Sequence, residues 1–272
     1  MVEIFDGGLG TELAKIVTLD SKLWSGGLLL TNPQLIQDLH EKYVKAGAKY
    51  ITTASYQTSY SSLRDEGLGA KSEEIWATSL KVAQEAAKLA EGVKVMASIG
   101  PYGSYVNDGS EYTGQYDISL PQLIEFHRPM VDFWNKSEAD IIIFETVPNP
   151  IELQAILSLA ITKPYIISFR VNDLMTIEAI NKTSFTDALA IGINCVDYKD
   201  ITEYYGQLTS TKNVVVYPNY GYQMINNQYQ STPEPSKWEE CVKQWISLGI
   251  WGIGGCCSTS PEEIAIISKL LT

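Results

Sequence analysis

One stretch of the chain decides the fold: Asp140-Ile141-Ile142-Ile143-Phe144, then Glu145-Thr146, then a helix-favouring segment over 150–161. The apolar run is far too short to span a bilayer, and its β-branched residues are typical of a strand. A strand followed by an amphipathic helix is one βα unit, and alternating βα units predict a parallel sheet. The polar pair Glu145-Thr146 lies where that strand is expected to end.

The same unit recurs along the whole chain. Short β-branched runs lie at Glu3–Phe5, Tyr50–Thr53, Val93–Ile99, Asp140–Phe144, Tyr165–Phe169, Leu189–Asn194, Asn213–Tyr217 and Trp251–Gly254. Helix-favouring segments lie at 33–46, 71–91, 119–137, 150–161, 174–182, 198–209, 236–248 and 260–271. Two of these segments begin with an N-cap residue and a proline, at Asn32-Pro33 and at Ser260-Pro261.

Eight units of this kind predict an α/β protein with a closed (β/α)8 TIM barrel, in which the site lies at the C-terminal face of the strands. We expect the barrel to be a single domain over residues 1–272. A doubly wound open sheet is the alternative, but no Gly-x-Gly-x-x-Gly turn opens an early helix. The fifth unit is the weakest, because residues 172–187 carry Asn, Thr, Ser and Asp and predict an irregular helix.

Charge and composition exclude several function classes. The chain has 20 Lys and Arg and 32 Asp and Glu, which gives a formal net charge of −12. Nucleic acids and anionic membranes require a basic surface, so we expect neither as a partner. Hydrophobic residues make up 45% and charged residues 19%, as in globular proteins. The opening residues lack a leader pattern and four cysteines make no disulfide framework, so a cytoplasmic, reduced protein is expected.

Three of the four cysteines follow expected strand ends: Cys195 after the sixth strand, and Cys256-Cys257 after the eighth. Because the C-terminal strand ends of a barrel meet at one face, these thiols are expected to converge. Three thiols suggest a Zn²⁺ site with one open coordination position. Buried packing, or a redox-active Cys256-Cys257 pair, are the alternatives. Cys241 lies in a helical segment and is expected to be a packing residue.

Three thiolates around Zn²⁺ make a centre that is a poor activator of water but suits a second thiol. A substrate thiol in the open position binds as its thiolate, because the metal lowers the pKa of that thiol. The residues alone therefore predict zinc-assisted attack by a thiol substrate on an electrophile.

A set of motifs runs from Asp6 to the end of the chain. They are Asp6-Gly7-Gly8, Gly10-Thr11-Glu12-Leu13, Leu23-Trp24-Ser25, Ala46-Gly47-Ala48, Thr53-Ala54-Ser55-Tyr56-Gln57, Gly100-Pro101-Tyr102-Gly103, Asp108-Gly109-Ser110-Glu111-Tyr112, His127-Arg128-Pro129, Glu145-Thr146, Pro148-Asn149, Gly192-Ile193-Asn194-Cys195, Tyr217-Pro218-Asn219 and Gly254-Gly255-Cys256-Cys257. In this order and spacing the chain resembles the zinc-dependent homocysteine S-methyltransferases, in the branch that uses S-methylmethionine or S-adenosylmethionine. The resemblance implies a (β/α)8 barrel, Zn²⁺, homocysteine as methyl acceptor and a sulfonium as methyl donor.

Carried over to this chain, the resemblance makes Cys195, Cys256 and Cys257 the catalytic zinc ligands, with homocysteine as the fourth ligand. It assigns Asp6 and Glu145 to the amino-acid end of homocysteine, since carboxylates complement an α-ammonium group. Without the resemblance, Asp6 also fits an Asx turn and Glu145 a strand-end charge that faces water.

The remaining substrate contacts follow from the same resemblance. The N–H groups of Gly7 and Gly8 are expected to face the homocysteine carboxylate, because glycine allows close approach. Trp24 and Tyr56 lie where the family places aromatic residues near the donor, and aromatic faces attract sulfonium cations. Asn194 and Asn219 complete the expected substrate-binding set, although Asn219 also fits a role in shaping its loop.

The tyrosine-rich loop over 101–116 is expected to act as a lid or simply to pack over the barrel mouth. His127 and Arg128, which follow it, are expected to serve the structure of their helix.

The sequence departs from the family pattern in three loops, where substrate preference lies. Tyr220-Gly221-Tyr222 replaces a Ser-Gly-Glu, Ser258 replaces an arginine, and residues 170–187 are shorter than in most relatives. Two alternatives therefore stay open. One is another zinc thiol or selenol methyltransferase, of the betaine or selenocysteine type. The other is a non-catalytic barrel that binds zinc or senses redox state, which intact Asp6, Glu145 and three thiols argue against.

Overall fold

Eight parallel strands pair in one sheet, in the order β1-β10-β7-β6-β5-β4-β3-β2. A parallel bridge between Phe5 and Tyr50 then joins the two edge strands and closes the sheet into a barrel. This computed structural model describes residues 2–19, 22–225, 228–231 and 234–272. The strands are β1 (Glu3–Ile4), β2 (Tyr50–Thr52), β3 (Lys94–Ile99), β4 (Ile141–Val147), β5 (Tyr165–Phe169), β6 (Ala190–Asp197), β7 (Asn213–Asn219) and β10 (Gly252–Ile253). The predicted (β/α)8 architecture is confirmed.

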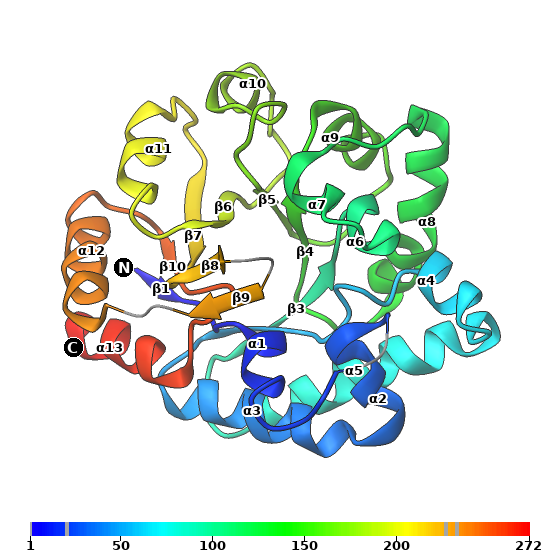
Figure 1. Cartoon of the computed structure of the whole chain (residues 1–272), viewed down its shortest axis with the longest axis horizontal. Coiled ribbons are helices and arrows are strands. Elements are labelled where there is room, and N and C mark those ends of the chain that lie inside the picture. Colours follow the sequence, from blue (N-terminus) through cyan, green and yellow to red (C-terminus); the bar gives the residue numbers. More distant parts are fainter. Residues whose placement is uncertain (1, 20–21, 226–227, 232–233) are drawn as a thin grey trace.

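Helices surround the strands in a ring (Figure 1). Those that match predicted segments are α3 (Pro33–Lys45), α5 (Ser72–Ala87), α8 (Leu120–Lys136), α9 (Pro150–Leu157), α10 (Ile177–Asn181), α11 (Ile201–Gln207), α12 (Pro235–Ser247) and α13 (Pro261–Leu271). The fifth unit is irregular, as expected. The side chain of Asn172 accepts hydrogen bonds from the N–H groups of Leu174 and Met175, at 2.8 and 2.7 Å, and this turn delays the start of α10. Among the described residues, no helix is both long and apolar enough to cross a membrane.

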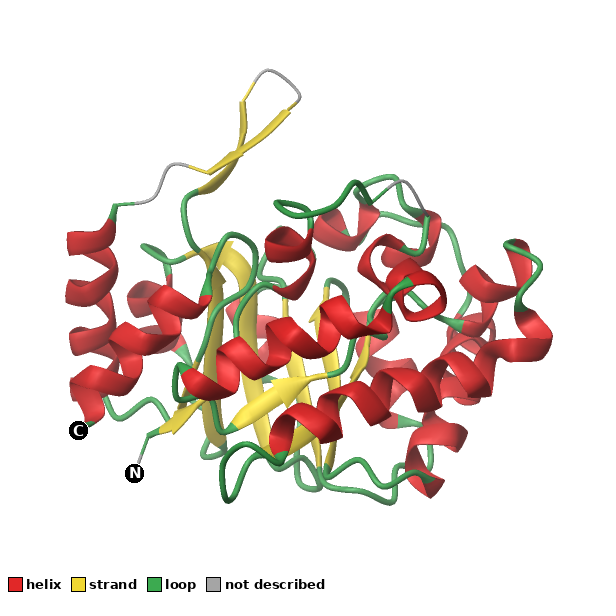
Figure 2. Cartoon of the chain, turned by 90° about the horizontal axis from the view of Figure 1, so that it is seen from below, coloured by secondary structure: helices red, strands yellow, loops and turns green. Residues whose placement is uncertain are grey.

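Several short elements lie outside the predicted pattern. They are α1 (Leu9–Leu13), η1 (Trp24–Gly27), α2 (Leu28–Thr31), α4 (Tyr60–Asp65), η2 (Gly69–Lys71), α6 (Tyr102–Val106), α7 (Ser110–Thr113) and the hairpin strands β8 (Tyr222–Ile225) and β9 (Gln228–Ser231). Helices this short are unstable alone and depend on tertiary contacts, so sequence periodicity does not reveal them. The hairpin stands clear of the barrel (Figure 2).

Alternation along the strands separates two cores. One face of each strand packs against the helices, and the other face fills the barrel interior. The interior cluster contains Phe5, Tyr50, Met96, Ile141, Ile143, Ile166, Ala190, Val215 and Tyr217. Because side chains on one face recur every second residue, the interior face of β3 continues from Met96 to Ser98, and that of β4 from Ile143 to Glu145. The polar residues at these strand ends therefore point into the mouth of the barrel.

The connection between β3 and α8 carries α6 and α7 and is fastened by the buried carboxylate of Glu152 in α9. Oε1 of Glu152 accepts a hydrogen bond from the N–H of Tyr102 and another from Nε2 of His127, both at 2.7 Å. Oε2 accepts a hydrogen bond from the hydroxyl of Tyr116. The Tyr102 ring also packs against Tyr105, Tyr116 and Phe126, with centroids 5.2 to 5.5 Å apart. The loop is thus ordered by its own contacts, and His127 has the structural role predicted for it.

We expect Glu152→Gln to destabilise the protein by about 2 kcal/mol. Both carboxylate oxygens accept hydrogen bonds, so the amide nitrogen of glutamine would face a donor in either orientation. Urea unfolding measures the change. Glu125→Gln is the control, because Glu125 lies on the exposed side of α8 and makes an exposed ion pair with Arg128. Equal stability of the two variants would contradict this role of Glu152.

Candidate active site and metal centre

Bulges at two strand ends aim functional side chains into the barrel mouth. The pairing register shifts between Phe144 and Val147 in β4, and between Asn194 and Asp197 in β6. Within these bulges Thr146 and Cys195 have positive φ angles, of 61° and 53°. This conformation is strained for residues other than glycine, and strained residues of this kind are concentrated at functional sites. The bulge in β6 places the Cys195 thiol beside the loop that follows β10.

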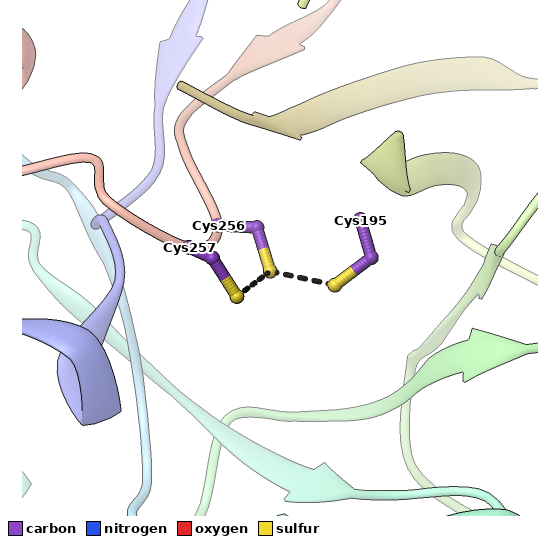
Figure 3. Close-up of side chains that lie close together, drawn as sticks. All are labelled: Cys195, Cys256 and Cys257. Carbon is purple, nitrogen blue, oxygen red and sulfur yellow. Dashed lines mark hydrogen bonds between the residues drawn. The ribbon is translucent and has the colours of Figure 1, made fainter. Parts of the chain in front are cut away.

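The three cysteines that the sequence placed at strand ends form one cluster (Figure 3). The Sγ atoms of Cys195 and Cys256 are 2.9 Å apart, and those of Cys256 and Cys257 are 4.0 Å apart. All three sulfur atoms lie within 4.8 Å of one another. This spacing suits three ligands of a single metal ion. Cys241 lies apart in α12 and packs against the hydrophobic core, as expected.

The three thiols differ in acidity. Hydrogen bonds from Cys256 and Cys257 lower the pKa of the Cys195 thiol well below its ordinary value. The bond with Cys195 raises the pKa of Cys256 and of Cys257 in turn. The first proton therefore leaves this cluster readily, whereas the next ones need a cation. A metal ion supplies that positive charge, because thiolates rather than thiols are metal ligands.

The cluster opens onto a cavity of about 500 Å³ at the C-terminal face of the barrel. Four carboxylates also line it: those of Asp6, Glu111 and Glu145, and that of the exposed Asp108. None of the described residues that line this cavity is a lysine, an arginine or a histidine. A pocket with this balance of charges fits ligands that bring positive charge with them.

Asp6 closes the barrel and borders the cavity at the same time. Its carboxylate accepts hydrogen bonds from the N–H of Thr52, at 2.7 Å, and from the Thr52 hydroxyl, at 3.0 Å. These bonds extend the junction between β1 and β2. Burial raises the pKa of Asp6 to about 7, against the lowering effect of the Thr52 hydrogen bonds. Each carboxylate oxygen has a second lone pair, so the group keeps capacity for a ligand.

Glu145 lies at the end of β4, on the interior face. Its carboxylate accepts a hydrogen bond from the Ser98 hydroxyl. Burial raises the pKa of Glu145 to about 8, and the charges of Asp6 and Cys195 add to this rise. Asp6 and Glu145 therefore border one cavity in which no described residue supplies a cation.

Close packing explains the two glycines after β1. A Cβ atom on Gly7 would lie 2.5 Å from the carbonyl oxygen of Thr259, and one on Gly8 would lie 2.3 Å from that of Cys256. These contacts hold the cysteine loop against β1. The N–H of Gly8 donates to the carbonyl of Thr259 at 2.9 Å. This N–H is therefore not directed at a substrate carboxylate, contrary to the expectation from the sequence. Sequence reasoning missed this bond because it joins residues at opposite ends of the chain.

The two expected aromatic residues both line the cavity. The indole of Trp24 lies against Gly10, where a Cβ atom would be 2.1 Å from Nε1. Trp24 is 39% exposed, which places it at the rim. Tyr56 is more enclosed: burial raises the pKa of its hydroxyl, and the charges of Glu111 and Cys195 raise it further.

The two expected asparagines lie behind the cavity instead of lining it. Asn194 is fully buried, and its amide bonds to the Thr146 main chain, to the Thr146 hydroxyl and to Ser168, at 2.7 to 3.1 Å. Asn219 accepts a hydrogen bond from the N–H of Cys257 at 3.1 Å. Both side chains hold the loops that carry the cysteines, and Asn219 also borders an adjoining cavity that contains Arg170.

Two residues of α7 also line the cavity: Tyr112, one of the loop tyrosines expected at the barrel mouth, and Glu111, to which the sequence assigned no role. Their motif was visible, but nothing in the spacing showed which side chains of the loop turn inward. Among the loop tyrosines, Tyr112 lines the cavity, whereas Tyr102 and Tyr116 pack around Glu152.

One departure from the family pattern has a structural use. Tyr220 is buried, packs against Tyr198 and Trp238, and donates its N–H to the carbonyl of Cys257 at 3.0 Å. Where the family pattern has a polar residue, this chain thus has a hydrophobic support for the cysteine loop.

Comparisons with known proteins agree with this site. The family described as homocysteine S-methyltransferase matches residues 3–271. The homocysteine S-methyltransferase YbgG of Bacillus subtilis is 34% identical and covers 97% of this chain and 93% of its own. The homocysteine S-methyltransferase of Escherichia coli has the same identity and coverage. The selenocysteine Se-methyltransferase of Brassica oleracea var. italica is also 34% identical, over 98% of this chain and 88% of its own.

Solved structures show the same fold. The metallated form of the Escherichia coli homocysteine methyltransferase MmuM superposes with a TM-score of 0.84, at 31% identity, over 99% of this chain and 96% of that one. Its oxidised form gives a TM-score of 0.85 at 32% identity, with the same coverage. These matches confirm the resemblance and the enzyme class predicted from the sequence. The chain belongs to the homocysteine S-methyltransferase family.

Proposed function

We propose that this protein transfers a methyl group from a sulfonium donor, S-methylmethionine or S-adenosylmethionine, to homocysteine and so forms methionine. One observation carries the proposal: three sulfur atoms within 4.8 Å of one another border the same cavity as Asp6 and Glu145. The acceptor thiol, its ammonium group and a cationic donor then all find complementary groups in one place.

Cys195, Cys256 and Cys257 would hold Zn²⁺, and the fit is supported by their spacing and by the absence of basic residues among the described residues that line the cavity. When bound there, zinc supplies an open position at which a substrate thiol loses its proton. Asp6 and Glu145 bind the homocysteine ammonium, which compensates two carboxylates whose ionisation the cavity otherwise disfavours.

On the donor side, the faces of Trp24 and Tyr56 attract the sulfonium by about 0.5–2 kcal/mol each. The homocysteine sulfur attacks the methyl carbon, the bond from that carbon to the sulfonium sulfur breaks, and a neutral thioether leaves. Opposite charges neutralise each other in this step, so it is favoured where water is excluded. Tyr112 and Trp24 line the cavity, and their rings would exclude water from the part that a donor fills.

A selenol acceptor is the second candidate function. It is favoured by the plant selenocysteine methyltransferase, which matches as well as the homocysteine enzymes do. The same cysteine cluster suits a selenolate, because it is a soft ligand like a thiolate.

A donor and acceptor panel tests both candidates. Zinc-loaded protein is incubated with homocysteine and, in parallel, S-methylmethionine, S-adenosylmethionine or betaine, and methionine is measured. We expect turnover with a sulfonium and none with betaine. Selenocysteine replaces homocysteine in a second series. Methionine from betaine alone, or no product from any pair with zinc bound, would contradict the proposal.

Zinc retention is expected to depend on the cluster. Cys256→Ala and Cys195→Ser should each reduce bound zinc from about one ion per chain to nearly none, and activity with it, because two thiolates hold the ion weakly. Cys241→Ala is the control and should keep both. Metal analysis of purified protein and a methionine assay give the result. Full zinc and full activity in either cluster variant would remove the cluster from the mechanism.

The raised pKa of Glu145 predicts how stability changes with pH in the ligand-free protein. The folded state favours the neutral carboxyl group of Glu145. The contribution of this group to the free energy of unfolding is therefore complete below the ordinary pKa of 4.5, and it is lost as pH rises through about 8. When the pH is raised from 6 to 9, the free energy of unfolding should therefore fall by about 1–2 kcal/mol more in the parent than in Glu145→Gln. Urea unfolding at both pH values measures this difference, with exposed Glu125→Gln as the control. Parallel losses in parent and Glu145→Gln would refute the assignment.

A further inference from the structure

A third buried carboxylate in the cavity, that of Glu111, has no role in the mechanism above. Its residue is 8% exposed and lies in α7, the short helix that covers the cavity. Burial raises the pKa of Glu111 to about 7, and the charges of Cys195 and Asp108 contribute, while a hydrogen bond from Tyr112 lowers it. No described lysine, arginine or histidine lines the cavity to pair with it.

Three of the carboxylates that line the cavity differ in their surroundings. The charge of Asp6 raises the pKa of Glu145. Glu111 lies next to Tyr112 in α7, and both line the cavity. Its charge raises the pKa of Tyr56 and of Tyr112 more than any other charge does, whereas Glu145 has a smaller effect on Tyr56. The Cys195 charge raises the pKa of both Glu111 and Glu145. The cavity thus offers a second acidic group for a ligand: Asp6 and Glu145 are assigned to homocysteine, and Glu111 lies beside the aromatic residues assigned to the donor.

The backbone holds Glu111 firmly in this position. A Cβ atom on Gly103 would lie 2.2 Å from the main-chain nitrogen of Glu111, so α6 and α7 are in close contact there. The carbonyls of Tyr112 and Gly114 accept hydrogen bonds from Asn172 and Asn149, at 3.0 and 2.9 Å. A carboxylate fixed in advance loses little freedom when it binds a ligand.

Two cationic groups of an amino-acid sulfonium compete for this carboxylate. The sulfonium loses its charge as the methyl group leaves, so an ion pair with it would stabilise the ground state more than the transition state and slow the reaction. The α-ammonium keeps its charge throughout, so an ion pair with it improves binding without that penalty. Chemistry therefore favours the ammonium as the partner of Glu111 and leaves the sulfonium to Trp24 and Tyr56.

We propose that Glu111 is a specificity-determining residue that binds the α-ammonium group of the methyl donor. It selects sulfonium donors that are amino acids over donors without a primary ammonium group. This inference rests on the proposed sulfonium-dependent methyl transfer.

The test compares zinc-loaded parent, Glu111→Gln and Asp117→Asn with two sulfonium donors. S-methylmethionine carries an α-ammonium, and 3-(dimethylsulfonio)propanoate does not. Asp117→Asn is the matched control, because it removes the same charge from an exposed position of the same loop. We expect Glu111→Gln to raise the KM for S-methylmethionine about tenfold or more while kcat changes less than about threefold. Its KM for 3-(dimethylsulfonio)propanoate, its KM for homocysteine and its zinc content should equal those of the parent.

An unchanged KM for S-methylmethionine in Glu111→Gln would overturn the inference, as would an equal loss with both donors. Unchanged zinc content and homocysteine KM show that the variant is folded. Failure of the proposed function looks different, since the parent itself then forms no methionine from either sulfonium. In that case calorimetric titration of S-methylmethionine into zinc-loaded parent and Glu111→Gln decides: weaker binding by the variant supports the inference, and equal binding overturns it.

Discussion

The site depends on negative charge that the protein itself leaves uncompensated. Three thiols and the enclosed carboxylates of Asp6, Glu111 and Glu145 border one cavity, with the exposed Asp108 at its edge, and no described lysine, arginine or histidine lines it. Burial disfavours the ionised form of each enclosed carboxylate and raises its pKa toward neutrality. A bound metal ion and the cationic groups of a ligand would relieve this cost. The charge of the cavity therefore complements cationic groups better than it complements neutral or anionic molecules. Amino acids and sulfonium compounds, which the family resemblance implies as substrates, carry such groups.

The barrel positions these groups through local departures from regular structure. Bulges in β4 and β6 turn Glu145 and Cys195 toward the mouth, with positive φ angles at Thr146 and Cys195. Asp6 has a structural role and a place in the site. Its carboxylate accepts hydrogen bonds from Thr52 that extend the closure of the sheet, and the same carboxylate lines the cavity. Strain and buried charge of this kind lower stability, and the large surrounding core makes them tolerable.

Arg170 brings a positive charge close to the cysteine cluster from the side of the adjoining cavity. Arg170, after β5, lowers the pKa of Cys195 from that side and donates its own Nη1 hydrogen bond to the carbonyl of Val171. Arg170 lies outside the main cavity. It therefore favours the thiolate of Cys195 without forming an ion pair with the carboxylates that line the main cavity.

The sequence by itself determined the eight βα units, the three converging cysteines and the family, because strand and helix periods and residue order are local properties. It did not reveal that the N–H of Gly8 is bonded to Thr259, that Asn194 supports Thr146, or that Glu111 turns inward. The hairpin of β8 and β9 and the short helices α6 and α7 were also missed. The hairpin is a local feature, since β8 pairs with the neighbouring β9. The other features appear only in the folded protein, because they depend on contacts between segments far apart in the chain. A local sequence pattern carries no information on the energies of such contacts.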